Sequence, residues 1–526
     1  MLLTYVSSLA GWGTVATGSA QILPPGARAH KTDSAADETG RPGGVSECDR
    51  SFDSGTAISR SVKPFAAVVT TGIYCRPGCG ARPNQQNVVR FGLAAAAEAA
   101  GFRACLRCRP YRVADLVLWS GPELVCRGVQ MILDGALDNG TEGTLAARLG
   151  VSPRHLRRLF TSHLGVTPDG LARSARAHFA RRLLDDTDLT IIEVAFAAGY
   201  GSVRQFNRAF ADIFRASPRE SRARRRARDR LVADGGLALR LPFEGPLDCN
   251  ALLSYLGARA IPGVEAVANG TYRRTIVIEG STGVLELRMG DPEHLVLVAH
   301  LPHWEELIHI VQRARRIAGL ELDLEEATEH LGRDPRLGPI VRARPGIRVP
   351  GTWDAFETGV RAIIGQHVSI AAANTITARL VQRLGTPAPG LGPMGLTHTF
   401  PSAETLADAD LADLGVSRSR AKSVTSFARA VAADEIRLDR SVDLKRLVES
   451  ITAIPGLGEW TANYLALRLG ERDAFPAGDL GLQRALNTRA SGAAKVSERW
   501  RPWRALAAMH LWLASDGQHL GRVAAA

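Results

Sequence analysis

The spacing of apolar and polar residues divides the chain into segments with different periodicities. Residues 1–44 are rich in Gly, Ala, Ser and Pro and show no sustained periodicity, which is typical of a disordered segment. Residues 120–230 have a helical pattern throughout, and the glycine pair at 235–236 indicates a linker after them. Amphipathic helical patterns dominate again beyond residue 300. The chain should therefore contain several domains.

Two further segments mix strand and helix patterns. In residues 45–115, "FAAVVT" reads as a strand and "LAAAAEAA" as a helix. After the linker, β-type runs such as "RTIVIEG" and "HLVLVAHL" alternate with a helix. We predict a multidomain fold: a small α/β domain over 45–115, an all-α domain over 120–230, an α+β subdomain over 237–310 and an all-α domain over 311–520.

Composition and charge indicate what the chain binds. Hydrophobic residues make up 45% and charged residues 22%, ordinary values for a globular protein. Residues 1–236 contain 32 Lys and Arg against 21 Asp and Glu, a net charge of +11, whereas the remainder has 33 against 32. A basic first half beside a nearly neutral second half predicts a polyanionic partner, nucleic acid above all, bound mainly by the first half.

The sequence favours a protein that works inside the cell. No apolar run approaches the roughly 20 residues that a bilayer span needs, and the opening residues lack the positive start of a signal peptide. The seven cysteines are not spaced like a secreted disulfide framework. We expect a cytoplasmic, nucleoid-associated protein with no membrane partner.

Four cysteines form two close pairs, Cys75 with Cys79 and Cys105 with Cys108, in C-x3-C and C-x2-C spacing. Two short pairs supply the four tetrahedral soft ligands that Zn²⁺ prefers, so we predict one Zn²⁺ held by all four. Most such sites are purely structural. Neighbouring cations favour a reactive one, because they keep a thiolate ionised and nucleophilic. The cations are Arg76, Arg82, Arg103, Arg107 and Arg109, whereas Cys48, Cys126 and Cys249 are isolated and read as buried or incidental thiols.

The stretch "FAAVVTTGIYCRPGCGAR…AAGFRACLRCRP" resembles the N-terminal domain of the adaptive-response regulator Ada. The resemblance implies that Cys75 irreversibly accepts methyl from a DNA methylphosphotriester, and that Arg82 contacts phosphate. Methylation replaces an anionic thiolate with a neutral thioether, which should tighten DNA binding and so convert damage into a signal.

The helical segment repeats one pattern twice, in "TLAARLGVSPRHLRRLFTSHLGVTP" and "TIIEVAFAAGYGSVRQFNRAFADIFRASPRESR". Each copy has a small-residue helix, a glycine turn and a second helix with exposed polar side chains, which is typical of a helix-turn-helix. Ordinary helical hairpins are the alternative. The double copy resembles the AraC-type DNA-binding domain, which implies binding to operator DNA and action with RNA polymerase. The predicted DNA-reading residues are Arg154, His155, Arg157, Arg158, Arg204, Gln205, Asn207 and Arg208.

The second half contains a helix-hairpin-helix signature at Ile454, Pro455, Gly456 and Gly458, in which glycines let backbone amides approach a phosphate. Asp479 follows Gly458 by 21 residues. A carboxylate there fits a glycosylase, because it can stabilise positive charge on the sugar or activate water. An N-cap is the alternative role for Asp479.

Nearly all of residues 237–520 resembles the AlkA-type 3-methyladenine DNA glycosylases, on "VPGTWDAFETGVRAIIGQHVSIAAANTITARL", the hairpin and "RWRPWRALAAMHLW". The resemblance places Trp460, Tyr464 and Trp512 in an aromatic base pocket, whereas plain core packing is the alternative. Electron-rich rings favour a flipped base that alkylation has made cationic. Related bifunctional enzymes have a lysine where this chain has Trp460, so we predict a monofunctional glycosylase without lyase activity.

Gln366 and His367 occupy the place where relatives have Gln and an intercalating Leu. We therefore assign Gln366 to the base pocket and His367 to the DNA contact, as a less apolar wedge that tunes base flipping differently. If His367→Leu leaves excision kinetics unchanged, His367 is not a tuned wedge.

Together these features predict a fusion of a methyl-sensing transcriptional activator with an alkylbase glycosylase that binds damaged and operator double-stranded DNA. No Cys is followed by His, so the Pro-Cys-His acceptor motif of O6-methylguanine methyltransferases is missing. Two alternatives remain open. One is a zinc-stabilised regulator whose glycosylase-like domain is non-catalytic, and the other is a glycosylase whose N-terminal half is a passive DNA tether.

Overall fold

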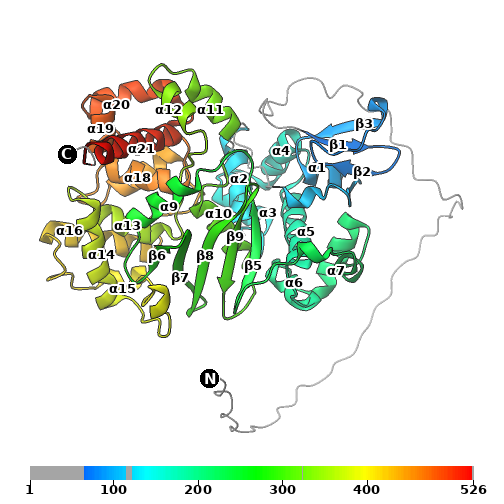
Figure 1. Cartoon of the computed structure of the whole chain (residues 1–526), viewed down its shortest axis with the longest axis horizontal. Coiled ribbons are helices and arrows are strands. Elements are labelled where there is room, and N and C mark those ends of the chain that lie inside the picture. Colours follow the sequence, from blue (N-terminus) through cyan, green and yellow to red (C-terminus); the bar gives the residue numbers. More distant parts are fainter. Residues whose placement is uncertain (1–63, 114–120, 323, 524–526) are drawn as a thin grey trace, which may run out of the picture. The chain divides into compact units, whose positions relative to one another are not determined.

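The computed structural model describes residues 64–113, 121–322 and 324–523 (Figure 1). The predicted disorder of residues 1–44 and the position of Cys48 lie outside these ranges. None of the helices described combines the length and the apolar character that a membrane span would need.

The first described domain is a small sheet with one helix, as predicted. Its strand order is β3-β1-β2-β4, in which β1 is antiparallel to both neighbours and β2 is parallel to β4. The rings of Phe65 and Tyr74 meet edge to face at 5.9 Å in its core. The elements are β1 (Phe65–Val68), β2 (Ile73–Cys75), β3 (Val88–Phe91), α1 (Ala94–Ala99), β4 (Arg103–Ala104) and 3₁₀ turns at Gln85–Asn87 and Pro110–Arg112.

Among the described residues from 121 to 230, seven α-helices and one 3₁₀ turn (Ala227–Asp229) follow, which confirms the all-α prediction. The pairs α3–α4 and α6–α7 each turn at a glycine with left-handed backbone, Gly150 with φ +72° and Gly199 with φ +76°. Phe206, Phe210 and Phe214 repeat every four residues along α7 and pack in its buried face. The helices are α2 (Glu123–Leu133), α3 (Glu142–Arg148), α4 (Pro153–Leu164), α5 (Pro168–Asp186), α6 (Ile191–Ala197), α7 (Val203–Phe214) and α8 (Pro218–Ala223).

An antiparallel five-stranded sheet of order β5-β9-β8-β7-β6 forms the predicted α+β subdomain (Figure 1). The predicted strands "RTIVIEG" and "HLVLVAHL" correspond to β7 and β9. The elements are β5 (Leu237–Pro242), α9 (Cys249–Ala258), β6 (Glu265–Ala268), β7 (Thr271–Ile278), β8 (Ser281–Asp291), β9 (His294–His300) and α10 (Leu307–Ile317).

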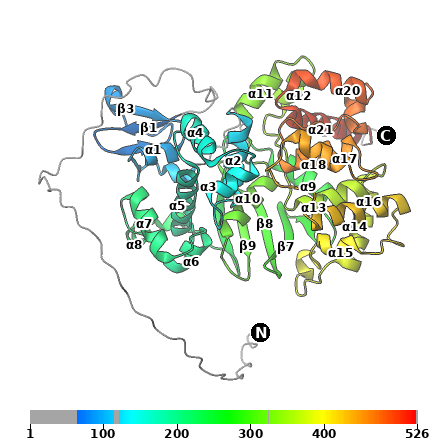
Figure 2. The same cartoon turned by 180° about the vertical axis from the view of Figure 1, so that it is seen from behind.

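The remaining elements are helical, as predicted. Gly359 lets α13 lie against α16, because a Cβ at this position would collide with the ring of Phe427. Helices α18 and α21 lie side by side in both views (Figures 1 and 2). The helices are α11 (Leu324–Gly332), α12 (Leu337–Ala343), α13 (Ala355–Ile364), α14 (Ile370–Leu384), α15 (Ala403–Ala407), α16 (Arg418–Ala432), α17 (Leu444–Thr452), α18 (Glu459–Leu469), α19 (Leu480–Leu486), α20 (Ala490–Ser497) and α21 (Arg504–Val523).

Candidate functional site

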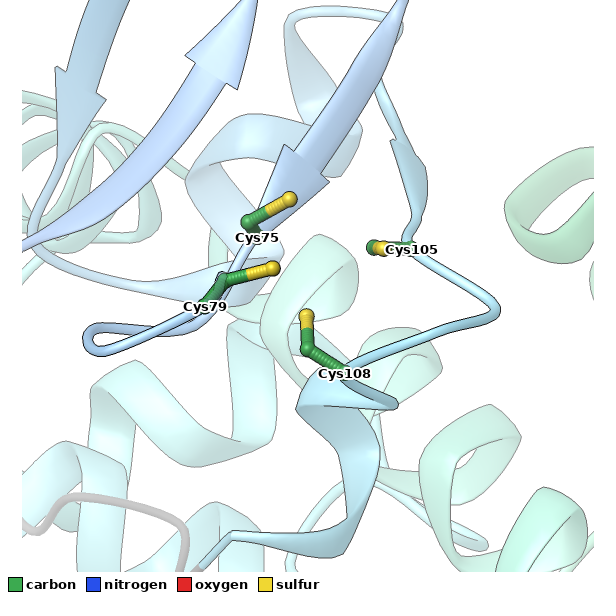
Figure 3. A group of neighbouring side chains, drawn as sticks. All are labelled: Cys75, Cys79, Cys105 and Cys108. Atoms are coloured by element: carbon green, nitrogen blue, oxygen red, sulfur yellow. The ribbon is translucent and has the colours of Figure 1, made fainter. Parts of the chain in front are cut away.

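The four paired cysteines come together at one end of the small sheet. Cys75 ends β2 and Cys105 follows β4, and the parallel pairing of these strands places the two side by side. The loops after each strand bring in Cys79 and Cys108, and all four sulfurs lie within 4.8 Å of one another. Figure 3 shows the four sulfurs pointing toward a common centre. In tetrahedral zinc sites with Zn–S bonds of about 2.3 Å the sulfurs are about 3.8 Å apart, so small adjustments suffice.

The acidity of the thiols also fits a metal centre. Burial, and then the charges of Cys108 and Cys105, raise the pKa of Cys75 well above its ordinary value. Burial raises the pKa of Cys108 to about 12. In Cys105, hydrogen bonds from the backbone amides of Cys108 and Arg107 outweigh burial and lower the pKa. Four clustered thiolates therefore require added positive charge, which a divalent cation such as Zn²⁺ supplies.

Four of the five arginines near the cysteines divide into two groups, and the fifth, Arg103, is half-buried. Arg76, Arg82 and Arg107 are exposed around the cluster, where they can meet a phosphate backbone. Arg109, by contrast, is buried and forms an ion pair with Asp229 at 2.6 Å. The predicted cationic surroundings are therefore present, but Arg109 is not part of them, because its buried ion pair stabilises the fold.

The strand that ends in Cys75 is fastened to helix α5 through the preceding residue. The Tyr74 hydroxyl donates to Glu98 Oε1 at 2.6 Å, and His178 Nε2 on α5 lies 2.6 Å from the same oxygen. All three side chains are buried or nearly so. The candidate acceptor is thus held by a buried polar contact to the helix that connects the two helix-turn-helix pairs.

Both second helices of the helix-turn-helix pairs begin at a serine cap and expose polar side chains. Ser152 accepts from the amide of His155 and Ser202 from that of Gln205, each at 3.2 Å. His155 is half-buried. The exposed residues on α4 and α7 are Arg154, Arg157, Arg158, Arg204, Gln205, Asn207 and Arg208.

Some of these basic residues have intramolecular partners. On α4, Arg157 donates to Glu142 at 2.9 Å and Arg158 contacts His155 at 3.0 Å. The arginine run at 222–230 also turns partly inward, since Arg222 donates to the backbone oxygen of Leu189 at 2.7 Å. Arg157 and Arg158 on α4 are therefore exposed but also engaged within the protein.

The hairpin between α17 and α18 alternates buried and exposed positions. Ile454 and Leu457 are buried and anchor the turn, whereas Pro455, Gly456 and Gly458 are exposed. Gly456 has φ +86°, a conformation that favours glycine. A Cβ at Gly458 would meet no atom within 4 Å, so open space lies over the start of α18 for a DNA phosphate.

The predicted aromatic residues meet beside the predicted carboxylate. Trp460 and Tyr464 stack on α18, with ring centroids 5.6 Å apart and planes at 18°. Trp512 on α21 meets Tyr464 edge to face at 6.3 Å. Both indole N–H groups donate to Asp479, from Trp460 at 3.2 Å and from Trp512 at 2.8 Å.

Asp479 caps a helix, which is the alternative role that the sequence left open, and it also lies against the predicted aromatic residues. It caps α19 by accepting from the amide of Leu482 at 3.1 Å, and it receives the two indole N–H groups at the same time. Its carboxylate is half-buried. Three N–H donors fix the orientation of the carboxylate, so a charged oxygen is presented next to the aromatic rings without further rearrangement.

The loop between α13 and α14 carries the last two predicted residues. His367 is exposed and has φ +56°, which is uncommon for a residue with a side chain. The side chain of Gln366 donates to Gly456 O at 3.2 Å and to Thr461 Oγ1 at 2.9 Å. Gln366 thus contacts the hairpin and α18 instead of extending into solvent.

Comparisons with known proteins cover all described domains. The chain matches the metal binding domain of Ada over residues 61–111 and a helix-turn-helix domain over 145–224. It also matches the AlkA N-terminal domain over 238–354 and the HhH-GPD superfamily base excision DNA repair protein over 360–499. A Mycobacterium tuberculosis protein described as "Probable bifunctional transcriptional activator/DNA repair enzyme AlkA" is 40% identical over 456 residues, 85% of this chain and 92% of that protein.

This chain belongs to that family of bifunctional transcriptional activators and DNA-repair enzymes. Two parts of the chain also match separate Escherichia coli proteins. DNA-3-methyladenine glycosylase 2 is 33% identical over 53% of this chain and 98% of its own length. Bifunctional transcriptional activator/DNA repair enzyme Ada is 38% identical over 22% of this chain and 32% of its own length. The predicted fusion of an Ada-type regulator with an AlkA-type glycosylase is confirmed.

Within this bifunctional enzyme, the sequence reading missed the residues behind the aromatic site. Arg468 is buried and donates to the hydroxyls of Tyr464 at 3.4 Å and Tyr255 at 3.3 Å. Burial opposes ionisation of Tyr464, but the positive charges of Arg468, Arg259 and Arg361 outweigh it and lower the pKa to about 8. The signal for Arg468 was a lone charge in the apolar run "YLALRLG", four residues after Tyr464.

Proposed function

We propose that this bifunctional protein acts on alkylated DNA at two sites. The glycosylase domain excises alkylated bases of the 3-methyladenine type, and the metal centre takes methyl groups from methylphosphotriesters onto Cys75. The methylated chain then activates transcription. The observation that best supports the first activity is the Asp479 carboxylate, held by the indoles of Trp460 and Trp512 at the edge of an aromatic site.

In base excision, the flipped base stacks on the aromatic rings, and the Asp479 carboxylate acts on the sugar of the same nucleotide. Electron-rich rings favour a base that carries the positive charge of alkylation. As the N-glycosidic bond breaks, positive charge develops on the sugar, and the nearby carboxylate stabilises it. Water adds to C1′ and loses its proton to Asp479, while the base leaves with the bonding electrons and becomes neutral. Trp460 occupies the place where related glycosylases with lyase activity have a lysine, so no Schiff base forms with the sugar.

In methyl transfer, the Cys75 sulfur attacks the methyl carbon of the phosphotriester. A sulfur–carbon bond forms as the carbon–oxygen bond breaks, and the phosphodiester leaves as an anion. Cys75, Cys79, Cys105 and Cys108 would hold one Zn²⁺, whose positive charge would keep the sulfur of Cys75 ionised. Exposed arginines, Arg82 among them, hold the flanking phosphates.

The transfer changes the charge of the cysteine cluster, which lies among exposed arginines that can meet a phosphate backbone. A thiolate becomes a thioether, so one negative charge is lost and repulsion of the phosphate backbone decreases. Tighter binding then holds helices α4 and α7 on operator DNA, where the chain acts with RNA polymerase. The buried contact from Tyr74 to His178 keeps the acceptor strand fixed to α5 during this change.

Methylated duplex DNA tests both activities in one reaction. We expect release of 3-methyladenine and 7-methylguanine, seen by chromatography, and one methyl group on Cys75, seen by peptide mass spectrometry. No base release would support a glycosylase-like domain that only binds DNA. No methyl on any cysteine would indicate that the N-terminal half only tethers the chain to DNA. A methyl group on Cys79, Cys105 or Cys108 would show that this cysteine, and not Cys75, is the acceptor.

A further inference from the structure

The loop of residues 365–369 presents an exposed tip with an unusual backbone. His367 has φ +56°, and Val368 and Ile370 on its far side are 37% and 45% exposed. Ser369 caps α14 by accepting from the amide of Ala372 at 3.2 Å, so the chain re-enters a helix at once. The tip is therefore short and apolar on one side. Contacts from neighbouring elements are needed to keep it in one conformation.

Gln366, which precedes His367 in the loop, makes such contacts through its side-chain amide. Its Nε2 lies 3.2 Å from Gly456 O in the hairpin and 2.9 Å from Thr461 Oγ1 on α18. Because Gly456 presents a carbonyl oxygen, only the NH₂ end of the amide can face it. Thr461 is 2% exposed and adjoins Trp460 in the chain. A single amide thus joins the tip, the hairpin and the helix that carries the aromatic site.

Helix α16 also contacts both the tip and the hairpin. Arg420 donates to the backbone oxygen of Gln366, and Ser423 Oγ donates to Pro455 O at 2.9 Å. Gly456 packs so closely on Ser423 that a Cβ would collide with its hydroxyl. Tip and hairpin are therefore both fastened to α16 as well as to each other.

We propose that Gln366 is a positioning residue that sets the tip at His367 in fixed register with the hairpin and Asp479. This inference rests on the proposed base excision. The tip would enter the base stack at the depth and place from which the displaced nucleotide reaches Asp479 while the hairpin holds the backbone. This role differs from the sequence prediction, which assigned Gln366 to the base pocket.

The expected effect is large on the chemical step and small on folding. The side-chain amide of Gln366 makes two hydrogen bonds, and the net contribution of such bonds to the stability of a folded domain is small. A misplacement of about 1 Å between reacting groups, however, can cost about 100-fold in rate. Loss of the amide should therefore slow excision about 10- to 100-fold, with little change in the unfolding temperature or in the affinity for undamaged duplex.

Two full-length variants test the proposal. Gln366→Met keeps the length of the side chain but removes the donors, and Gln366→Glu places an oxygen against the Gly456 carbonyl. Gln382→Met on the exposed face of α14 is the matched control. The measurements are the single-turnover excision rate, the Kd for undamaged duplex, the unfolding temperature, and the fluorescence of 2-aminopurine beside an abasic-site analogue, which reports opening of the stack.

We expect both Gln366 variants to lose excision rate and 2-aminopurine signal together, while Gln382→Met stays at the wild-type level. Thr461→Val should add little to Gln366→Met, because the contact between Thr461 and Gln366 is already lost in Gln366→Met. Unchanged rate and signal would overturn the proposal, as would an equal loss of stability and of all DNA binding. A rate loss that depends on the base opposite the lesion would indicate direct base contact instead. If wild type releases no base, the proposed function fails, but the 2-aminopurine signal still tests Gln366.

Discussion

Replacement of Asp479 by Asn removes the charge from the candidate excision site and changes little else. Asn caps helices about as well as Asp, and its oxygen can still accept from Leu482 and Trp512. Its NH₂ group would, however, face the indole N–H of Trp460, which is 3.2 Å from the present carboxylate oxygen. This donor–donor contact should cost about 1 kcal/mol in stability.

The catalytic loss should be larger than this local cost. Two unit charges about 4 Å apart attract by about 4 kcal/mol at an effective dielectric constant of about 20. At 1.36 kcal/mol for each tenfold change in rate, the loss of this attraction to the developing charge on the sugar should slow excision about 1,000-fold.

The assay is single-turnover release of 3-methyladenine from duplex DNA at saturating protein. Asp443→Asn is the matched control, because Asp443 also caps a helix of the same domain, accepting from the amide of Arg446 at 2.9 Å. Binding to a duplex with an abasic-site analogue should change less than about threefold in both variants, since the phosphate contacts stay intact. An Asp479→Asn variant that excises at the wild-type rate would refute the role assigned to this carboxylate.

Three further predictions concern the metal, the aromatic site and the hairpin. Zinc should copurify at one ion per chain by atomic absorption. Cys126→Ser, a change outside the cysteine cluster, should keep the zinc, whereas Cys79→Ser should lose it. Tyr464 should show phenolate absorbance from about pH 8, absent in Tyr464→Phe. Because this pKa lies below the ordinary 10, its contribution to stability is fully present above pH 10 and is lost as pH falls through 8. Gly456→Ala should weaken DNA binding and lower the unfolding temperature, because its Cβ collides with Ser423 at positive φ. Gly458→Ala, in open space, should weaken DNA binding with the unfolding temperature unchanged; equal losses of stability in the two variants would contradict the assigned geometry.

Sequence patterns predicted the local geometry wherever it depends on residues at short spacing. The cysteine pairs, the glycine turns at Gly150 and Gly199, and the hairpin before α18 all depend on residues close in the chain. Their local geometry follows from metal preference or from the backbone freedom of glycine. The strand and helix patterns likewise predicted the α/β, all-α and α+β segments that the structure contains.

Contacts between distant segments could not be predicted in this way. Arg109 looked like one more cation near the cysteines, yet it pairs with Asp229, 120 residues further along the chain. Gln366 meets Gly456 and Thr461 across about 90 residues, so its partners become visible only when α13 packs on α18. Hydrophobic periodicity gives the faces that are buried but not the polar partners found there.

The proposed encounter with alkylated DNA at two sites is tested most directly by counting methyl groups on the protein after incubation with methylated duplex. Peptide mass spectrometry should find one methyl on Cys75 of each zinc-loaded chain, and the same methyl in the Asp479→Asn variant, because the two sites work independently. A chain that stays unmethylated on every cysteine while the DNA retains its methylphosphotriesters would contradict the account.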